Sequence, residues 1–184
     1  FNKMKYTGSK NRIAKYILPI MLEHKTEDMV WIEPFVGGAN MIDKLEGKRI
    51  GFDNNEYLIE LYHYIQNGGE IKDRTITKKQ WYNVKENIEK HPKWYIGLIG
   101  VLGSYNGNWF GSYGGGSETK EGNYRNYFDE GIRGLLKQDL SDIDFVFSDY
   151  RNIETPKNSL IYCDPPYRLK NKRYKEHFDS EIFF

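Results

Sequence analysis

Apolar residues recur at helical spacing in the first part of the chain and alternate there with short apolar runs. Residues 11–24 carry isoleucine and methionine three to four positions apart, which predicts a helix that Pro19 kinks or divides. The elements expected next are a strand ending near Glu33, then a helix, a strand and a helix over residues 39–47, 49–55 and 56–68. Such alternation is typical of a parallel sheet with helices on its faces.

The pattern changes twice in the second half of the chain. Residues 77–102 have apolar positions at helical spacing, whereas residues 103–128 are rich in Gly, Asn, Ser and aromatic residues and show no stable period. We interpret the latter as a long loop or a small inserted lobe. A further helix and two strands are expected over residues 129–140, 144–150 and 159–164.

Composition adds limits to this picture. The 184 residues suggest one domain with a small insert, and the formal net charge of +1 means that any nucleic-acid binding depends on local patches. Cys163 is the one cysteine, so no intrachain disulfide is possible and a reducing, cytoplasmic setting is expected. No apolar run is long enough to cross a bilayer, and the four histidines lack metal-ligand spacing, so we expect neither membrane nor metal as a partner.

Acidic residues follow the expected strands. Glu33, Asp53, Asp149 and Asp164 each come at or just after a strand end, where an open parallel sheet binds its ligand. Asp53 lies about 20 residues after Glu33, a spacing typical of an acid that binds ribose hydroxyls. The turn between them lacks the glycines that a pyrophosphate needs, which favours a nucleoside without a phosphate chain. The alternative is an ordinary tight turn at Gly37-Gly38, with Asp53 as a helix cap.

Four short motifs resemble a known family in their order and spacing. They are KYTGSK (5–10), EPFVGG (33–38), FDNN (52–55) and DPPY (164–167), and they resemble the motifs of Dam-type, alpha-group DNA adenine-N6 methyltransferases. The resemblance covers nearly the whole chain and implies an α/β, Rossmann-like fold that binds S-adenosylmethionine (SAM) and releases S-adenosylhomocysteine (SAH). The family continues past DPPY with further strands, so we expect the C-terminal strands to be missing from this sheet.

The resemblance also implies the residues that hold the cofactor. Those that match the family's cofactor-binding positions are Tyr6, Lys10, Glu33, Gly37, Gly38, Asp53 and Asp164, together with the acid–aromatic pair Asp149-Tyr150. The family often has tryptophan where this chain has Tyr6, and either ring can pack against a cofactor. The alternative for Asp149-Tyr150 is a strand end followed by a core tyrosine.

The DPPY motif suits the chemistry of an exocyclic amine. A carboxylate oxygen of Asp164 and the carbonyl of Pro165 offer two acceptors for the two N–H bonds of adenine N6. Pro165 and Pro166 restrict the backbone and so hold these acceptors in place. Tyr167 offers a ring for base stacking, and the base must leave the duplex to reach such a pocket. The alternative is a strand-terminating turn with a buried tyrosine.

Two segments are candidates for contact with DNA. Positive residues follow DPPY directly, where phosphate contacts beside the catalytic pocket are expected, at Arg168, Lys170, Lys172 and Arg173. The 103–128 segment carries Arg125 and Asn126, residue types suited to reading guanine and adenine. A solvated, basic surface loop is the alternative in both places.

The sequence thus predicts a site-specific DNA methyltransferase that acts on N6 of a flipped-out adenine in double-stranded DNA. Residues 1–76 and 129–184 form the SAM-binding catalytic domain, and residues 77–128 form an insert that recognises the target. The alternatives are a non-catalytic remnant that binds SAM or DNA, and an enzyme acting on RNA adenine. The sequence carries no signal for the target site or the oligomeric state.

Overall fold

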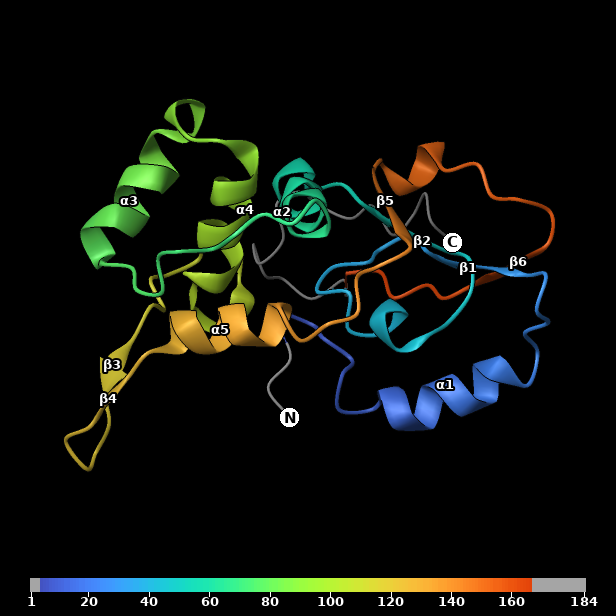
Figure 1. The fold of residues 1–184 in the computed structure, drawn as a ribbon, viewed down its shortest axis with the longest axis horizontal. Helices are drawn as coiled ribbons and strands as arrows, with labels where there is room; N and C mark the ends of the chain where they lie inside the picture. Colours follow the sequence, from blue (N-terminus) through green and yellow to red (C-terminus); the bar gives the residue numbers. More distant parts are fainter. Residues whose placement is uncertain (1–3, 167–184) are drawn as a thin grey trace.

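The computed structural model describes residues 4–166, which fold as a four-stranded sheet with most of the helices gathered beyond one of its edges (Figure 1). The α-helices are α1 (Ala14–Leu22), α2 (Glu56–Gln66), α3 (Lys78–Glu86), α4 (Lys93–Leu102) and α5 (Tyr127–Leu135). The strands are β1 (Val30–Glu33), β2 (Arg49–Asp53), β3 (Ser117–Glu118), β4 (Tyr124–Arg125), β5 (Ile143–Phe147) and β6 (Ser159–Ile161). Four 3-10 helices complete the set: η1 (Ile42–Lys44), η2 (Ile88–Lys90), η3 (Tyr105–Gly107) and η4 (Tyr150–Asn152).

The main sheet has the strand order β5-β2-β1-β6, and every pair in it is parallel. The chain passes from β1 outward to β2 and β5, then returns to place β6 on the other side of β1. Strand order therefore reverses between β1 and β6, which creates the switch point where open α/β sheets bind ligands. The predicted α/β, Rossmann-like fold with a mostly parallel sheet is confirmed.

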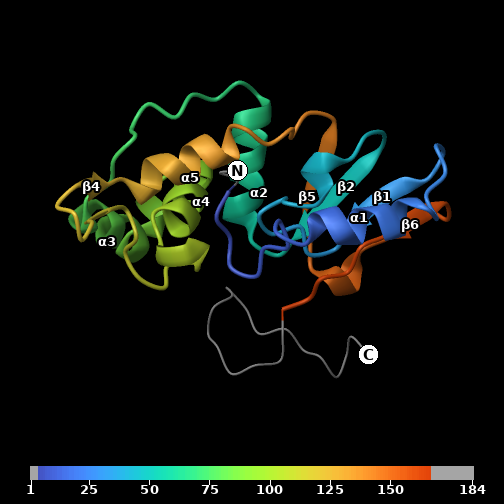
Figure 2. The same cartoon turned by 90° about the horizontal axis from the view of Figure 1, so that it is seen from below.

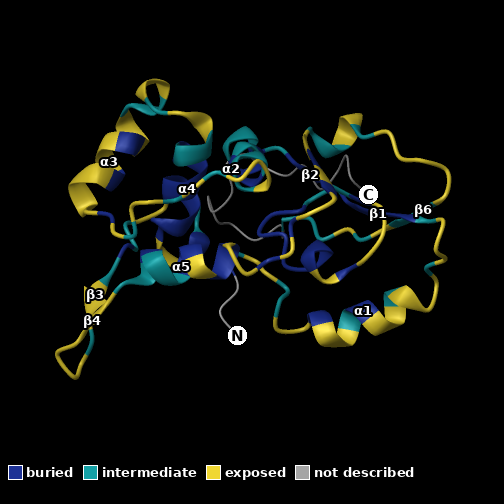
Figure 3. Ribbon diagram, in the orientation of Figure 1, coloured by how far each residue is buried: buried dark blue, intermediate teal, exposed yellow. Residues whose placement is uncertain are grey.

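The two faces of the sheet carry hydrophobic clusters of very different size. Neighbouring side chains of a strand point to opposite faces, so Trp31 joins the large cluster under α1 and α2 while Ile32 joins a small one with Val30 and Phe52. Figure 3 shows many buried residues in α4, and β1 and β2 are likewise almost fully buried, whereas the β3–β4 hairpin is exposed. The large cluster continues beyond the sheet into α3, α4 and α5, so one hydrophobic core joins the sheet to these helices.

Helices α2 and α4 pack at close range and join the sheet to the helical lobe formed by α3, α4 and α5. Gly97 of α4 lies against the backbone of Tyr57 in α2, where an added Cβ would come within 2.7 Å of the Tyr57 carbonyl carbon. Nearby, the rings of Tyr64 and Trp94 stack with centroids 3.9 Å apart. The turned view in Figure 2 also places α2 between the sheet and the helical lobe.

Polar caps and one proline set the helix ends. Asn55 accepts a hydrogen bond from Tyr57 N at the start of α2, and Thr77 forms a capping box with Gln80 at the start of α3. The helical pattern over residues 77–102 corresponds to α3, η2 and α4, and Pro92, which lacks an N–H, is the N-cap residue of α4.

Three other element boundaries differ from expectation. Residues 39–47 form only the single turn η1, and the predicted loop 103–128 contains η3 and the β3–β4 hairpin. The last helix begins at Tyr127, two residues early, because Asn126 accepts a hydrogen bond from Asp129 N and caps it there. These short elements have too few residues to show a period.

We expect Gly97→Ala to lower the free energy of unfolding by about 1–3 kcal/mol, because the added methyl group overpacks the α2–α4 contact. Urea denaturation measures this change. Gly131→Ala in α5 is the matched control, since the atoms nearest to its Cβ belong to the Leu102 side chain, with Cδ2 at 3.3 Å, and not to a helix backbone; alanine also favours the helix. A Gly97→Ala protein as stable as the parent would contradict the close approach of the two helices.

Candidate functional site

A cleft opens along the carboxyl ends of the four parallel strands. Its walls come from the segment before α1, from the residues that follow β1, β2, β5 and β6, and from the loop after α4. In sequence, these lining segments are 6–10, 33–38, 40–41, 53–55, 148–151, Tyr162 with 164–166, and Gly107 with Trp109. Parallel pairing brings together acids that lie far apart in the sequence, so each strand contributes a polar end to one cavity.

Asp53 ties two walls of the cleft together. One carboxylate oxygen accepts a hydrogen bond from Gly37 N at 3.0 Å, and the other accepts from Asn55 N at 2.9 Å. The carboxylate is therefore fixed in orientation while still lining the cleft. The cap of α2 is the side chain of Asn55, so a helix-capping role does not account for Asp53.

The glycine turn after β1 packs directly on Tyr6. Gly37 has a φ of 46°, and a Cβ there would come within 2.7 Å of Tyr6 Cε1. A Cβ on Gly38 would approach Tyr6 Cβ at 2.6 Å. Tyr62 fixes the turn from below, since its hydroxyl donates to the carbonyl of Gly37 at 2.5 Å. Only glycine lets this turn and ring form a shared, closely packed wall.

Glu33 is a buried acid at the end of β1. Its carboxylate accepts a hydrogen bond from Trp31 Nε1 at 2.9 Å, and its side chain lines the floor of the cleft. Burial raises the pKa of Glu33 to about 8, against the smaller opposing effect of the Trp31 hydrogen bond. Glu33 is therefore protonated at neutral pH.

Asp164 forms an ion pair with Lys10 across the cleft. The ammonium of Lys10 donates to the two carboxylate oxygens at 2.6 and 2.5 Å, and to the carbonyl of Gly8 at 2.9 Å. Both side chains are largely shielded from solvent. Pro165 and Pro166 follow along the same wall. The sequence-predicted pair of acceptors at Asp164 and Pro165 therefore borders the cleft.

A second ion pair lies after β5. Arg151 donates from Nε and Nη2 to the two oxygens of Asp149, at 2.8 and 2.5 Å. These hydrogen bonds lower the pKa of Asp149 to about 2. Next to it, the ring of Tyr150 lies 5.3 Å from that of Phe35, so two aromatic side chains border this end of the cleft.

The loop after α4 supplies wall residues that the sequence does not reveal. Gly107 accepts a hydrogen bond from Thr7 N at 3.4 Å and packs against Tyr6, while Trp109 stacks on Tyr57 with centroids 5.7 Å apart. The glycine-rich composition of 103–128 was a signal for close backbone packing, but the residues that Gly107 contacts are about 100 positions away.

The nine predicted cofactor residues all line this one cleft, and so do Pro165 and Pro166. The structure places Arg125 and Asn126 elsewhere, at the end of β4 and at the N-cap of α5. Arg125 pairs with Glu130 at 2.7 Å, and Asn126 donates to the carbonyl of Arg74 in addition to capping the helix. Tyr167 and the basic residues Arg168, Lys170, Lys172 and Arg173 lie outside the described residues.

We expect Glu33→Gln to stabilise the ligand-free protein at pH 8 by on the order of a few kcal/mol and to have little effect near pH 4.5. The folded state keeps the Glu33 proton up to about pH 8, whereas the unfolded state releases it near pH 4.5. The wild-type protein therefore loses stability as pH rises through this window. Thermal unfolding across the pH range measures the difference.

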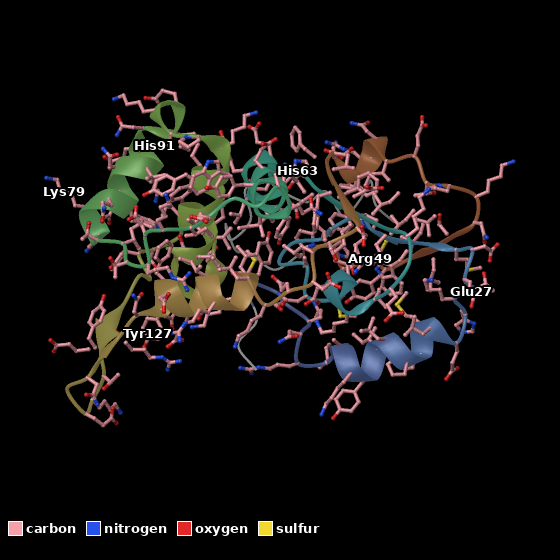
Figure 4. All side chains as sticks on the ribbon, in the orientation of Figure 1. Glu27, Arg49, His63, Lys79, His91 and Tyr127 are labelled. Carbon is pink, nitrogen blue, oxygen red and sulfur yellow. The ribbon has the colours of Figure 1, made fainter. Side chains whose placement is uncertain are left out.

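Glu27→Gln is the matched control, since Glu27 is exposed in the turn after α1 (Figure 4). That substitution should leave the dependence of stability on pH unchanged. If Glu33→Gln and Glu27→Gln give parallel curves, Glu33 is not a buried acid with a raised pKa.

Comparison with known proteins identifies the family. No curated protein matches the chain in a direct sequence search. Among residues 4–166, no helix is long and apolar enough to span a membrane, and no cluster of acidic, histidine or cysteine side chains is arranged to hold a metal ion. The family model described as D12 class N6 adenine-specific DNA methyltransferase matches residues 6–184. The chain with this cleft therefore belongs to the D12 class of N6 adenine-specific DNA methyltransferases.

Proposed function

We propose that the protein transfers the methyl group of SAM to N6 of an adenine that has turned out of double-stranded DNA. The observation that carries the proposal is the position of Asp164 and Pro165. Both border the cleft on the β6 side of the switch point, while Asp53 borders it on the β2 side. A nucleoside held by Asp53 can then extend along the strand ends toward the acceptor pair.

The residues of the cleft fit SAM. Asp53 offers carboxylate oxygens to ribose hydroxyls, and the Phe35 and Tyr150 rings beside it suit an adenine base. The turn at Gly37-Gly38 is packed against Tyr6, so the space beside these glycines is filled by that side chain and is not open to a pyrophosphate. This favours a nucleoside that carries an amino acid over a dinucleotide.

Asp164 and Pro165 would act as acceptors for the two N–H bonds of adenine N6. When bound, SAM supplies a methyl group activated by an adjacent sulfonium. The amine lone pair is delocalised into the purine ring, and two acceptors in the plane of the N–H bonds localise it for attack. They also stabilise the positive charge that develops on N6. The prolines restrict the backbone, so little reorganisation is needed as the charge grows.

The proton on N6 becomes acidic only once the new bond has formed. Asp164 can accept that proton or pass it to water, so no separate general base is required beforehand. Positioning of the amine and the methyl donor along one line supplies much of the remaining acceleration. The chain's own contribution is therefore geometric and electrostatic.

We assign contact with DNA to the insert at residues 77–128 and to the basic residues after DPPY. The β3–β4 hairpin projects from the helical lobe, with Tyr124 and Arg125 exposed on it (Figure 1). Arg125 can exchange its ion pair with Glu130 for a phosphate or a base edge, since its side chain is exposed. Asn126 would have to act while it caps α5, so Arg125 is the better candidate of the two.

Incubation of the protein with methyl-labelled SAM and unmethylated plasmid DNA tests the proposal. We expect label in N6-methyldeoxyadenosine after digestion to nucleosides, and restriction mapping or sequencing gives the methylated site. RNA transcribed from the same plasmid is the competitor that separates the two nucleic acids. Labelled RNA with unlabelled DNA, or no labelled adenine with folded protein, would overturn the proposal.

Asp164→Ala should abolish methyl transfer, by at least about 1,000-fold, because N6 loses its carboxylate acceptor. The rate of label incorporation into plasmid DNA measures the loss. Circular dichroism should report a folded protein, since Asp164 lies at the cleft and outside both hydrophobic clusters. Substantial transfer by this variant would remove Asp164 from the reaction.

Asp53→Asn should weaken SAH binding by about 10- to 100-fold, because a hydrogen bond to a charged group contributes roughly 1.5–3 kcal/mol. Titration calorimetry measures the affinity. Asp144→Asn is the control, since Asp144 is exposed on β5 and does not line the cleft. Equal affinities for the Asp53→Asn and Asp144→Asn proteins would exclude Asp53 from the ribose site.

A further inference from the structure

The ammonium of Lys10 is bound where the proposed reaction needs a bare carboxylate. It lies within 2.6 Å of both oxygens of Asp164, so it draws electron density from the acceptor that N6 is to use. Its positive charge also opposes the positive charge that develops on the amine during transfer. With Lys10 in this position the cleft is closed to the reaction, and the ammonium has to move before transfer.

Two cationic side chains line the cleft among the described residues. The cationic side chains in its lining are Lys10 and Arg151, and Arg151 spans both oxygens of Asp149. The two pairs follow β6 and β5, which are the opposite edges of the sheet. Lys10 is therefore the lining cation on the Asp164 side.

The orientation of the cofactor follows from the same strand order. If Asp53 on β2 holds the ribose, the base lies toward β5, with Tyr150 and Phe35, and the amino-acid part lies toward β1 and β6. The amino-acid part of SAM carries a carboxylate, which is a partner of the same chemistry as Asp164. It would arrive on the side of the cleft where Lys10 is placed.

We propose that Lys10 is a latch on Asp164, released when its ammonium exchanges the Asp164 carboxylate for the carboxylate of the bound cofactor. This inference rests on the proposed function and adds an order of binding, in which the cofactor binds before the target adenine. Cofactor binding prepares the acceptor for the target amine, so an adenine that enters the ligand-free cleft meets a carboxylate already engaged. Lys10 acts as a positioning residue, since it alters what Asp164 can accept.

A thermodynamic cycle with SAH tests the exchange without DNA. The four proteins are the wild type, Asp164→Asn, Lys10→Met and the double variant, and titration calorimetry measures their affinity for SAH. Asparagine keeps the shape of Asp164 but removes its charge, so Lys10 no longer leaves an ion pair when SAH binds. We expect Asp164→Asn to tighten SAH binding about 5- to 10-fold when Lys10 is present and less than 2-fold in the Lys10→Met background.

SAH suits this test because it lacks the sulfonium charge, which Asp164 would otherwise attract. Methylthioadenosine, which has no amino-acid part, is the matched ligand, and its affinity should not rise in Asp164→Asn. Asp149→Asn is the matched variant, because its ion pair is with Arg151, and its effect should be the same with Lys10 or methionine at position 10.

The outcomes separate the latch from the function on which it rests. Tighter SAH binding that requires Lys10 and is absent for methylthioadenosine supports the latch. An equal change in both backgrounds, no tightening, or the same tightening for methylthioadenosine overturns the latch while leaving the cofactor assignment intact. If the folded wild-type protein does not bind SAH at all, the proposed cofactor is wrong and the latch falls with it.

Discussion

Strand order is the constraint on which the rest of this molecule depends. Four parallel strands must end at the same edge of a sheet, and the reversal of order between β1 and β6 leaves a gap there. The polar residues that end the strands then face one another across that gap. Glu33, Asp53 and Asp164 line one cleft only because the sheet is parallel and β6 pairs with β1 on the side away from β2. The cleft is thus a product of topology before it is a product of side-chain chemistry.

Much of this could be predicted from the sequence because the signals are local. A buried strand followed by an acid or a glycine turn is contiguous in the chain, as in VWIEPFVGG and SLIYCDPPY. Parallel pairing then brings the ends of these strands to the same edge of the sheet. The order of the four motifs indicated the family, and the match of the family model over residues 6–184 confirms it. The predicted cofactor residues that follow strands line one cleft for this reason, and Tyr6 and Lys10 join them from the segment before α1.

The parts that could not be predicted depend on contacts between distant segments. Nothing in the sequence around Lys10 indicates that it pairs with Asp164, more than 150 positions away. Likewise, the burial that raises the pKa of Glu33 comes from the packing of the whole cleft, and the break before α4 depends on one proline within an apolar run. The residue types of Arg125 and Asn126 suit contact with bases, but residue type carries no information about their neighbours at the end of β4 and the start of α5.

The placement of Gly107 against Lys5 and Tyr6 has a practical meaning for redesign. The loop after α4 looks like a freely exchangeable part of an insert, yet Gly107 and Trp109 in it line the cleft. A graft of this region from a relative with a different sequence preference would have to keep residues 105–110 and begin beyond them. Substitutions in the β3–β4 hairpin should therefore disturb the cleft less than substitutions in the loop that precedes it.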